Sequence, residues 1–198
     1  MTRYNPIEFW NAYAEKRGLS WNEPSNYTEM DNLISMIREY LGPEAKILDV
    51  GSGWGRFLKR CRTKKLNNVK VSMCDISQEY IKLAIRKTGV VPTWWDGKTL
   101  PYEDDSFDLV ISQSCMLHVK PYNVKRVWME HVRVSKKYLY IATATPERTP
   151  ERLAIDRKGE GHCYAHNYAK LIKDSGLEII KEASYSEGRR TSWLFKKN

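Results

Sequence analysis

The stretch from Lys46 to Phe57, KILDVGSGWGRF, constrains the fold of this chain more than any other stretch. Its first half is apolar and partly β-branched, which predicts a short buried strand. Glycine follows at alternate positions, at Gly51, Gly53 and Gly55. Glycine allows a sharp turn, and without a Cβ it lets the backbone approach a ligand closely. The stretch therefore predicts a strand, a glycine-rich loop and a helix that bind a nucleotide-like ligand.

Two common glycine-loop patterns do not match. The dehydrogenase fingerprint needs a third glycine where this chain has Arg56, and a P-loop needs Gly-Lys-Ser or Gly-Lys-Thr. What remains is a strand followed by Asp-x-Gly-x-Gly-x-Gly, which resembles the first motif of class I S-adenosylmethionine-dependent methyltransferases. In that family the loop passes under the methionine part of the cofactor, whose sulfonium is cationic. The resemblance implies Asp49, Gly51, Ser52 and Gly53 as cofactor-binding residues.

Two further acidic positions extend the resemblance. Asp75 lies 20 residues after Gly55, about where a carboxylate holds ribose hydroxyls in βαβ nucleotide folds. The alternative is that Asp75 caps the next helix. The family pattern also implies that Ile76 packs on the adenine, and that Asp96, with Gly97 beside it, accepts a hydrogen bond from the adenine amine. Asp96 could instead be a turn former, as Asp-Gly often is between strands.

The resemblance, which covers about residues 45–145, implies one α/β domain of Rossmann-like methyltransferase fold. We expect a seven-stranded, mostly parallel sheet in the order 3-2-1-4-5-7-6, with helices on both faces. Residues 1–44 are predicted to form a helical cap and residues 45–145 the cofactor-binding core. Residues 146–198 are predicted to form a substrate loop, a helix and an antiparallel hairpin. A length of 198 residues, 41% of them hydrophobic, fits a single domain with a sizeable core.

The chemistry is expected at the end of the fourth strand, in SQSCMLHV, because ligands in open α/β sheets bind outside the strand ends. Ser112 is predicted to lie at the cofactor. In small-molecule methyltransferases with a similar arrangement, the residue matching His118 lies near the transferred methyl group. Since histidine titrates near neutral pH, His118 is a candidate base for a hydroxyl or amine. A histidine bonded to backbone is the alternative. Cys115 as a nucleophile is disfavoured, because a free cysteine in an apolar run is usually a core residue.

The acceptor pocket is predicted from the two ends of the chain. A helix starting at Pro6 carries Trp10 and Tyr13, which either cover the pocket as a lid or pack at the domain edge. The longest irregular stretch ends in GHCYAHN, and long loops in compact domains tend to be functional. We expect His162, Tyr164 and His166 to bind the acceptor. Arginines at 148, 152 and 157 could hold an anionic acceptor instead.

No metal is expected. A site built from His162, Cys163 and His166 would lack a clear fourth ligand. The four cysteines, Cys61, Cys74, Cys115 and Cys163, are widely spaced and are expected to be reduced thiols. No apolar run approaches the ~20 residues needed to span a bilayer, and the N-terminus lacks the apolar core of a signal peptide. We therefore expect a cytoplasmic protein with no membrane partner.

The predicted activity is methyl transfer from S-adenosylmethionine to an oxygen or nitrogen atom of a small or medium-sized acceptor, leaving S-adenosylhomocysteine. A net charge of +9 also permits a nucleic acid partner, although the basic residues are spread out. RNA or protein methylation is therefore one alternative. A cofactor-binding regulatory subunit without turnover is another. A nicotinamide-dependent dehydrogenase is a lesser alternative, because Arg56 interrupts its fingerprint.

Overall fold

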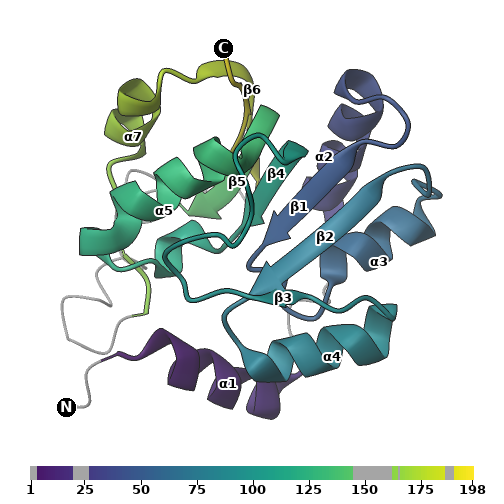
Figure 1. Ribbon diagram of the computed structural model, residues 1–198, viewed down its shortest axis with the longest axis vertical. Coiled ribbons are helices and arrows are strands. Elements are labelled where there is room, and N and C mark those ends of the chain that lie inside the picture. Colours follow the sequence, from purple (N-terminus) through teal and green to yellow (C-terminus); the bar gives the residue numbers. More distant parts are fainter. Residues whose placement is uncertain (1–3, 20–26, 145–161, 165, 186–189) are drawn as a thin grey trace.

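The computed structural model describes residues 4–19, 27–144, 162–164, 166–185 and 190–198, which form a seven-stranded sheet with helices around it (Figure 1). The strands are β1 Lys46–Val50, β2 Lys70–Asp75, β3 Thr93–Trp94, β4 Phe107–Gln113, β5 Ser135–Ala144, β6 Glu178–Tyr185 and β7 Arg190–Lys196. Their order is β3-β2-β1-β4-β5-β7-β6. The first five strands are parallel, and β7 runs antiparallel between β5 and β6. The predicted strand order is confirmed.

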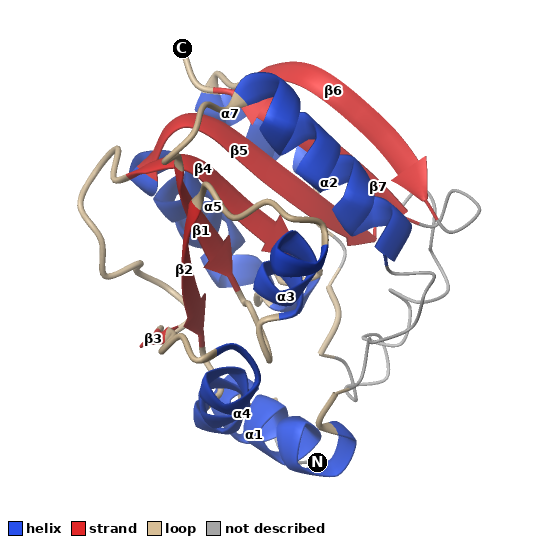
Figure 2. Ribbon diagram, turned by 90° about the vertical axis from the view of Figure 1, so that its right-hand side faces the viewer, coloured by secondary structure: helices blue, strands red, loops and turns tan. Residues whose placement is uncertain are grey.

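Helices cover both faces of this sheet (Figures 1 and 2). The helices are α1 Pro6–Arg17, α2 Tyr27–Tyr40, α3 Arg56–Thr63, α4 Gln78–Thr88, α5 Pro121–Val134, α7 Tyr168–Ser175 and the 3₁₀ turn η2 Met116–His118. One hydrophobic cluster joins α2 and α3 to the sheet, and another joins α5 and α7 to it. None of the helices in the described ranges is long and apolar enough to cross a membrane.

Strand β1 is buried on both faces, as expected for a central parallel strand. Leu48 and Val50 belong to the cluster with α5 and α7, whereas Ile47 belongs to the cluster with α2 and α3. Because successive side chains of a strand point to opposite faces, Asp49 lies on the same face as Ile47. The strand therefore places a carboxyl group among apolar side chains.

Local sequence signals explain the ends of two helices, and α1 begins at Pro6 as predicted. Helix α1 begins at Pro6, and the side chain of Asn5 caps it by accepting a hydrogen bond from the N–H of Ile7 at 3.1 Å. Asn167 caps α7 with its side chain, and Gly176 ends that helix with a φ of 66°. A positive φ costs glycine little free energy, which explains why the helix ends at this residue.

The position predicted for the third strand was wrong. The apolar pair Val90–Val91 in the sequence predicts this strand, but the strand lies at Thr93–Trp94, which pairs in parallel with Cys74 and Asp75 at the end of β2. The side chain of Val91 is 70% exposed. A two-residue edge strand is selected by backbone pairing with its neighbour, so the apolar pattern used for the prediction did not locate it.

The loop after β3 is anchored to α5 by Arg133. The guanidinium of Arg133 donates to the carbonyl oxygens of Tyr102 and Leu100 at 2.8 and 3.0 Å, and it pairs with Asp104 and Glu130. Glu130 accepts a further hydrogen bond from the N–H of Leu100 at 2.8 Å. One partly buried ion pair therefore fixes the path of this loop.

We expect Arg133→Ala to lower the free energy of unfolding by about 2 kcal/mol, because several charged hydrogen bonds lose their donor. Urea denaturation measures this change. Lys82→Ala is the control, since it removes an exposed pair with Glu79 that should contribute less than about 0.5 kcal/mol. Equal costs for the two substitutions would show that the loop does not depend on Arg133.

Candidate functional site

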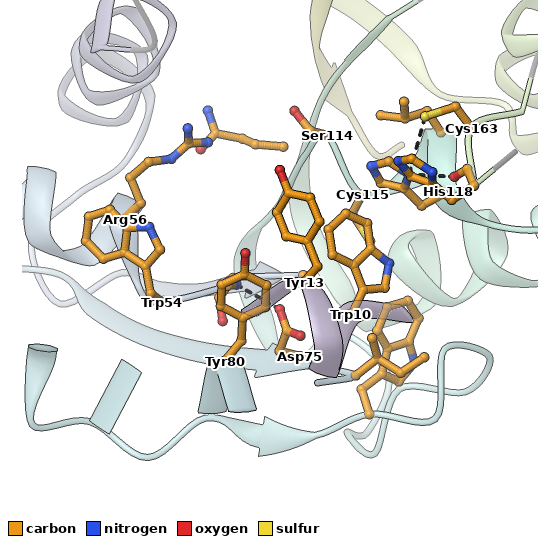
Figure 3. A pocket seen from close by; sticks show the side chains of 18 of the residues that line it. Trp10, Tyr13, Trp54, Arg56, Asp75, Tyr80, Ser114, Cys115, His118 and Cys163 are labelled. Carbon is orange, nitrogen blue, oxygen red and sulfur yellow. Dashed lines mark hydrogen bonds between the residues drawn. The ribbon is translucent and has the colours of Figure 1, made fainter. Parts of the chain in front are cut away.

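A pocket opens at the carboxyl edge of the parallel strands (Figure 3). Its wall includes residues just after β1, β2 and β4, the last residue of β5 and the first residue of β7. Helix α1 lies across this edge beside α4 (Figures 1 and 2) and adds Trp10 and Tyr13 to the wall. This edge is where ligands bind in open α/β sheets.

The backbone of the loop after β1 requires glycine, as Gly51 and Gly53 show. Gly51 has a φ of 72°, and a Cβ there would lie 2.8 Å from Sγ of Cys115. Gly53 has a φ of 55°, and its N–H donates to Oδ2 of Asp75 at 2.7 Å. Both glycines and Ser52, which the sequence analysis named as cofactor-binding residues, line the pocket. The loop thus presents its backbone to the cavity without side chains in the way.

Asp75 lines the pocket at the end of β2. Its Oδ1 accepts a hydrogen bond from the N–H of Ser77 at 2.9 Å, while its Oδ2 accepts from Gly53. The N-cap of α4 is Ser77, whose side chain accepts from the N–H of Tyr80. Burial raises the pKa of Asp75 to about 6, although backbone hydrogen bonds oppose the shift. The carboxylate is therefore positioned at the cavity rather than used as the helix cap.

Asp49 is buried and is not among the residues that line the pocket. Burial raises its pKa to about 7; the positive charge of Arg56 lowers this pKa, and the negative charge of Asp75 raises it. Asp49, predicted from the sequence as a cofactor-binding residue, therefore does not contact the cavity.

The side of the pocket next to β3 is formed by Ile76 and Trp95. Gly97 packs behind Ile76, since a Cβ on Gly97 would lie 3.0 Å from Cδ1 of Ile76. Asp96 is exposed, and its Oδ1 accepts from the N–H groups two and three residues later at 2.8 and 2.9 Å. Neither Asp96 nor Gly97 lines the pocket. The geometry of Asp96 is that of the turn former which the sequence left as an alternative.

Two atoms in the wall suit a polar nucleoside. Nε1 of Trp95 and Oγ of Ser52 are buried and have no hydrogen-bond partner among the described residues. Leaving such groups unsatisfied costs free energy, which a ligand with its own donors and acceptors can recover. Ser112, predicted to contact the cofactor, is fully buried and does not line the pocket.

His118 lies on the pocket wall at the end of η2. Its Nδ1 is 2.6 Å from the carbonyl oxygen of His162. Because a carbonyl oxygen can only accept, Nδ1 must carry the proton, and in the neutral ring Nε2 then keeps the basic lone pair. The His118 ring also stacks on His162 at 5.2 Å between centroids and meets the edge of Trp10 at 4.7 Å. His118 is thus bonded to backbone and faces the cavity at the same time.

The three residues predicted in the GHCYAHN stretch separate. His162 lines the pocket, whereas Tyr164 and His166 do not. His166 is buried, and its Nε2 is 3.1 Å from the carbonyl oxygen of Met116. Burial lowers the pKa of His166, so the ring stays neutral at physiological pH. His166 therefore has a structural role, because it bonds to the backbone of η2.

The histidines and cysteine near this stretch form a hydrogen-bonded group. The ligand atoms of His118, His162 and Cys163 lie within 4.8 Å of one another, whereas His166 points to Met116. Sγ of Cys163 is 3.7 Å from Nδ1 of His118, the nitrogen that already bonds to the His162 carbonyl.

Cys115 sits in the wall against Gly51. Burial raises the pKa of its thiol to about 12. The thiol is therefore protonated at neutral pH, which argues against the cysteine nucleophile considered from the sequence.

Sequence reasoning missed part of the wall. It did not name Trp54, Tyr80, Trp95 or Arg190 as site residues, and it used Arg56 to exclude a dehydrogenase. Trp54 lies inside the glycine loop, and Arg56 follows the loop directly. Their positions in the sequence could therefore have indicated that they belong to the site. The arginines predicted at 148, 152 and 157 lie outside the described residues.

Comparisons with known proteins point to one family. Residues 47–138 match a family model described as a methyltransferase domain. The methyltransferase GfsG of Streptomyces halstedii is 26% identical to this chain, over 86% of the chain and 68% of GfsG.

Solved structures agree in fold. A putative methyltransferase, solved in a complex with the Haloferax volcanii Trm112 methyltransferase activator, has a TM-score of 0.74 at 16% identity and covers 98% of this chain and 99% of its own. Magnesium protoporphyrin IX methyltransferase from Synechocystis, with bound S-adenosylhomocysteine, also has a TM-score of 0.74 at 16% identity, and covers 96% of this chain and 99% of its own.

We expect Asp75→Asn to weaken binding of S-adenosylhomocysteine at least tenfold at pH 8, because an amide accepts ribose hydroxyl protons less strongly than a carboxylate. In the wild-type protein the affinity should fall as the pH drops below about 6, where the carboxyl protonates. Titration calorimetry between pH 5 and pH 8 measures both effects. Wild-type affinity that stays flat over this range would exclude Asp75 as an ionised contact.

Proposed function

We propose that this chain, whose residues 47–138 match a methyltransferase domain and whose fold is that of S-adenosylmethionine-dependent methyltransferases, methylates an oxygen or nitrogen atom of a small or medium-sized acceptor. S-adenosylhomocysteine is the product of its cofactor. The observation that carries this proposal is the hydrogen bond between Nδ1 of His118 and the carbonyl oxygen of His162 on the pocket wall. It makes Nε2 the basic nitrogen of the ring, the type of group that takes a proton from an acceptor hydroxyl or amine.

In the proposed reaction the cofactor supplies the methyl group and His118 removes the proton of the acceptor. S-adenosylmethionine supplies a methyl group on a sulfonium, which an acceptor atom can displace in line. When Nε2 of His118 takes the acceptor proton, the ring becomes cationic, and the bond from Nδ1–H to the carbonyl strengthens. The His162 carbonyl thus favours the protonated state that the reaction produces. His118 is the catalytic residue of this proposal.

A small acceptor agrees with the shape of the site. Trp10 and Tyr13 from α1 cover the pocket, and Leu117 and His162 add apolar and aromatic surface next to His118. Such a wall suits a compact acceptor with a planar or apolar body. We therefore propose Trp10, Tyr13 and His162 as acceptor-binding residues. The four cysteines are free thiols, which supports a reducing compartment such as the cytoplasm.

An activating partner is the second candidate. The structural neighbour from the Haloferax complex is accompanied by a methyltransferase activator. Activity of this chain would then depend on a second protein, and a macromolecular acceptor such as RNA would suit the net charge of +9.

The first experiment is calorimetry followed by an acceptor screen. We expect S-adenosylhomocysteine to bind with micromolar affinity, about 8 kcal/mol. Radiolabelled methyl transfer is then measured with hydroxyl- and amine-bearing small molecules, total RNA and total protein. Small-molecule labelling by the isolated chain supports the proposal. Labelling confined to RNA, with binding that falls steeply with salt, would replace it with the alternative.

For an acceptor found in this way, we expect His118→Ala to lower kcat by about 10²- to 10⁴-fold, the range for loss of a general base. The affinity for S-adenosylhomocysteine should stay the same, because the substitution removes no proposed cofactor contact. His131→Ala is the matched control, since His131 is a buried histidine of α5 outside the pocket and is not bonded to η2. Unchanged turnover in His118→Ala would rule out an essential base.

A further inference from the structure

Three side chains of metal-binding type gather on one part of the pocket wall. His118 ends η2, while His162 and Cys163 come from the segment before α7. Their ligand atoms, one from each residue, all lie within 4.8 Å of one another. Figure 3 shows the sulfur of Cys163 beside the ring of His118. Two imidazoles and a thiol are donors that suit a zinc ion.

The distance between two of these atoms fits a zinc ion. Zinc binds thiolate sulfur at about 2.3 Å and imidazole nitrogen at about 2.1 Å, so a tetrahedral site separates these two ligand atoms by about 3.6 Å. Sγ of Cys163 lies 3.7 Å from Nδ1 of His118. The whole set spans no more than 4.8 Å, so a shift of about 1 Å in the His162 ring completes the three-ligand arrangement.

Backbone contacts hold the two segments together. The N–H of Tyr164 donates to the carbonyl oxygen of Leu117 at 2.7 Å, and Nε2 of His166 is 3.1 Å from the carbonyl oxygen of Met116. These contacts fasten the residues that follow Cys163 to η2. The three ligands therefore meet in the folded protein itself, which lowers the cost of ordering them around an ion.

The fourth position of the site opens to the cavity. In the sequence, His162, Cys163 and His166 lack a clear fourth ligand, and no metal is expected from them. In the structure His118 takes the place of His166 in the group, and all three members line the pocket. Three protein ligands with an open position for water or a bound molecule are typical of catalytic zinc sites. A fourth protein ligand is therefore not required.

We propose that His118, His162 and Cys163 form a zinc site in the pocket wall, and that the bound ion inhibits methyl transfer. Binding forms one Zn–S bond and two Zn–N bonds. The thiol proton passes to water, and the ring proton of His118 moves from Nδ1 to Nε2 through water. The zinc site stands on this geometry alone, whereas the inhibition rests on the proposed function.

The inhibition follows from the tautomer of His118. With zinc on Nδ1, that nitrogen no longer donates to the carbonyl oxygen of His162, and the one proton of the neutral ring lies on Nε2. Nε2 then has no lone pair that could take the acceptor proton. The ion therefore removes the proposed base, and it touches neither the glycine loop nor Asp75.

Cobalt spectroscopy tests the site itself, because Co²⁺ occupies zinc sites and its bond to a thiolate gives a charge-transfer band. The probe is cobalt chloride, added to the wild-type protein with a thiol-free reductant. We expect this band in the wild type, its loss in Cys163→Ser, and Co²⁺ binding weakened about tenfold or more in His162→Ala. Zinc chloride should abolish the band, because thiolate ligands favour zinc, and magnesium chloride should leave it unchanged, because Mg²⁺ prefers oxygen ligands.

The matched control is Cys61→Ala, since Cys61 is a buried cysteine of α3 outside the pocket. This variant should keep the band. Thermal unfolding of each variant is recorded first, and His162→Ala removes a second ligand independently of Cys163. A wild-type protein without the thiolate band, or a folded Cys163→Ser variant that keeps it, would overturn the zinc site.

Methyl transfer to an acceptor from the screen tests the inhibition. Zinc chloride is titrated into the reaction, and each variant is compared with its own rate without zinc. The wild type should lose turnover over the zinc concentrations that displace cobalt, and Cys163→Ser should need about tenfold or more zinc for the same fractional loss.

Calorimetry with S-adenosylhomocysteine separates the two possible failures. Its affinity should be the same with and without zinc, because the ion touches no proposed cofactor contact. Turnover that ignores zinc, in a protein that shows the cobalt band, would overturn the inhibition. A wild-type protein that shows the band but does not bind S-adenosylhomocysteine would overturn the proposed function and leave the zinc site in place.

Discussion

Two backbone hydrogen bonds at the end of β2 hold the site together. The N–H groups of Gly51 and Ser52 both donate to the carbonyl oxygen of Cys74, at 2.9 and 3.1 Å. They tie the glycine loop to the neighbouring strand, so that the next N–H in reach, from Gly53, meets the carboxyl group of Asp75. The cavity wall at the sheet centre follows from this junction. A larger side chain at Gly51 would meet Cys115 and break it.

This junction also places ionisable groups where ionisation is costly. Burial raises the pKa values of Asp49 and Asp75 to about 7 and about 6, above the ordinary value of 3.8. The folded protein therefore binds protons more tightly than the unfolded chain at both carboxyls. Their ionisation reduces stability above these values, and the penalty fades as the pH falls toward 4. The protein thus loses some stability at the carboxyl edge of the sheet, where the pocket lies. Such a loss is common at active sites.

The sequence predicted the parts of the site that depend on local backbone chemistry. Gly51 and Gly53 were found because a turn with positive φ demands glycine, and Asp75 because its spacing from the loop follows from one βαβ unit. Strand order followed from the family resemblance.

Other parts depend on contacts that local patterns do not encode. Glu29, Gln113 and Arg190 come together from a helix and two strands spread over most of the chain. The tautomer of His118 is set by a carbonyl 44 residues later. Asp96 was predicted as a contact from its motif, whereas in the structure its Oδ1 accepts two hydrogen bonds from its own turn, which only the geometry reveals.

Helix α1 is attached to the rest of the molecule in a particular way. Asn11 accepts a hydrogen bond from the hydroxyl of Ser77 at 2.9 Å, and Ala14 packs with Trp54 and Tyr80, so that the helix is fastened beside α4 and the glycine loop rather than built into the sheet. Trp10 and Tyr13 face the cavity from this one short segment. During evolution, substitutions at these two aromatic positions can therefore reshape one wall of the pocket while the glycine loop on the other side stays unchanged.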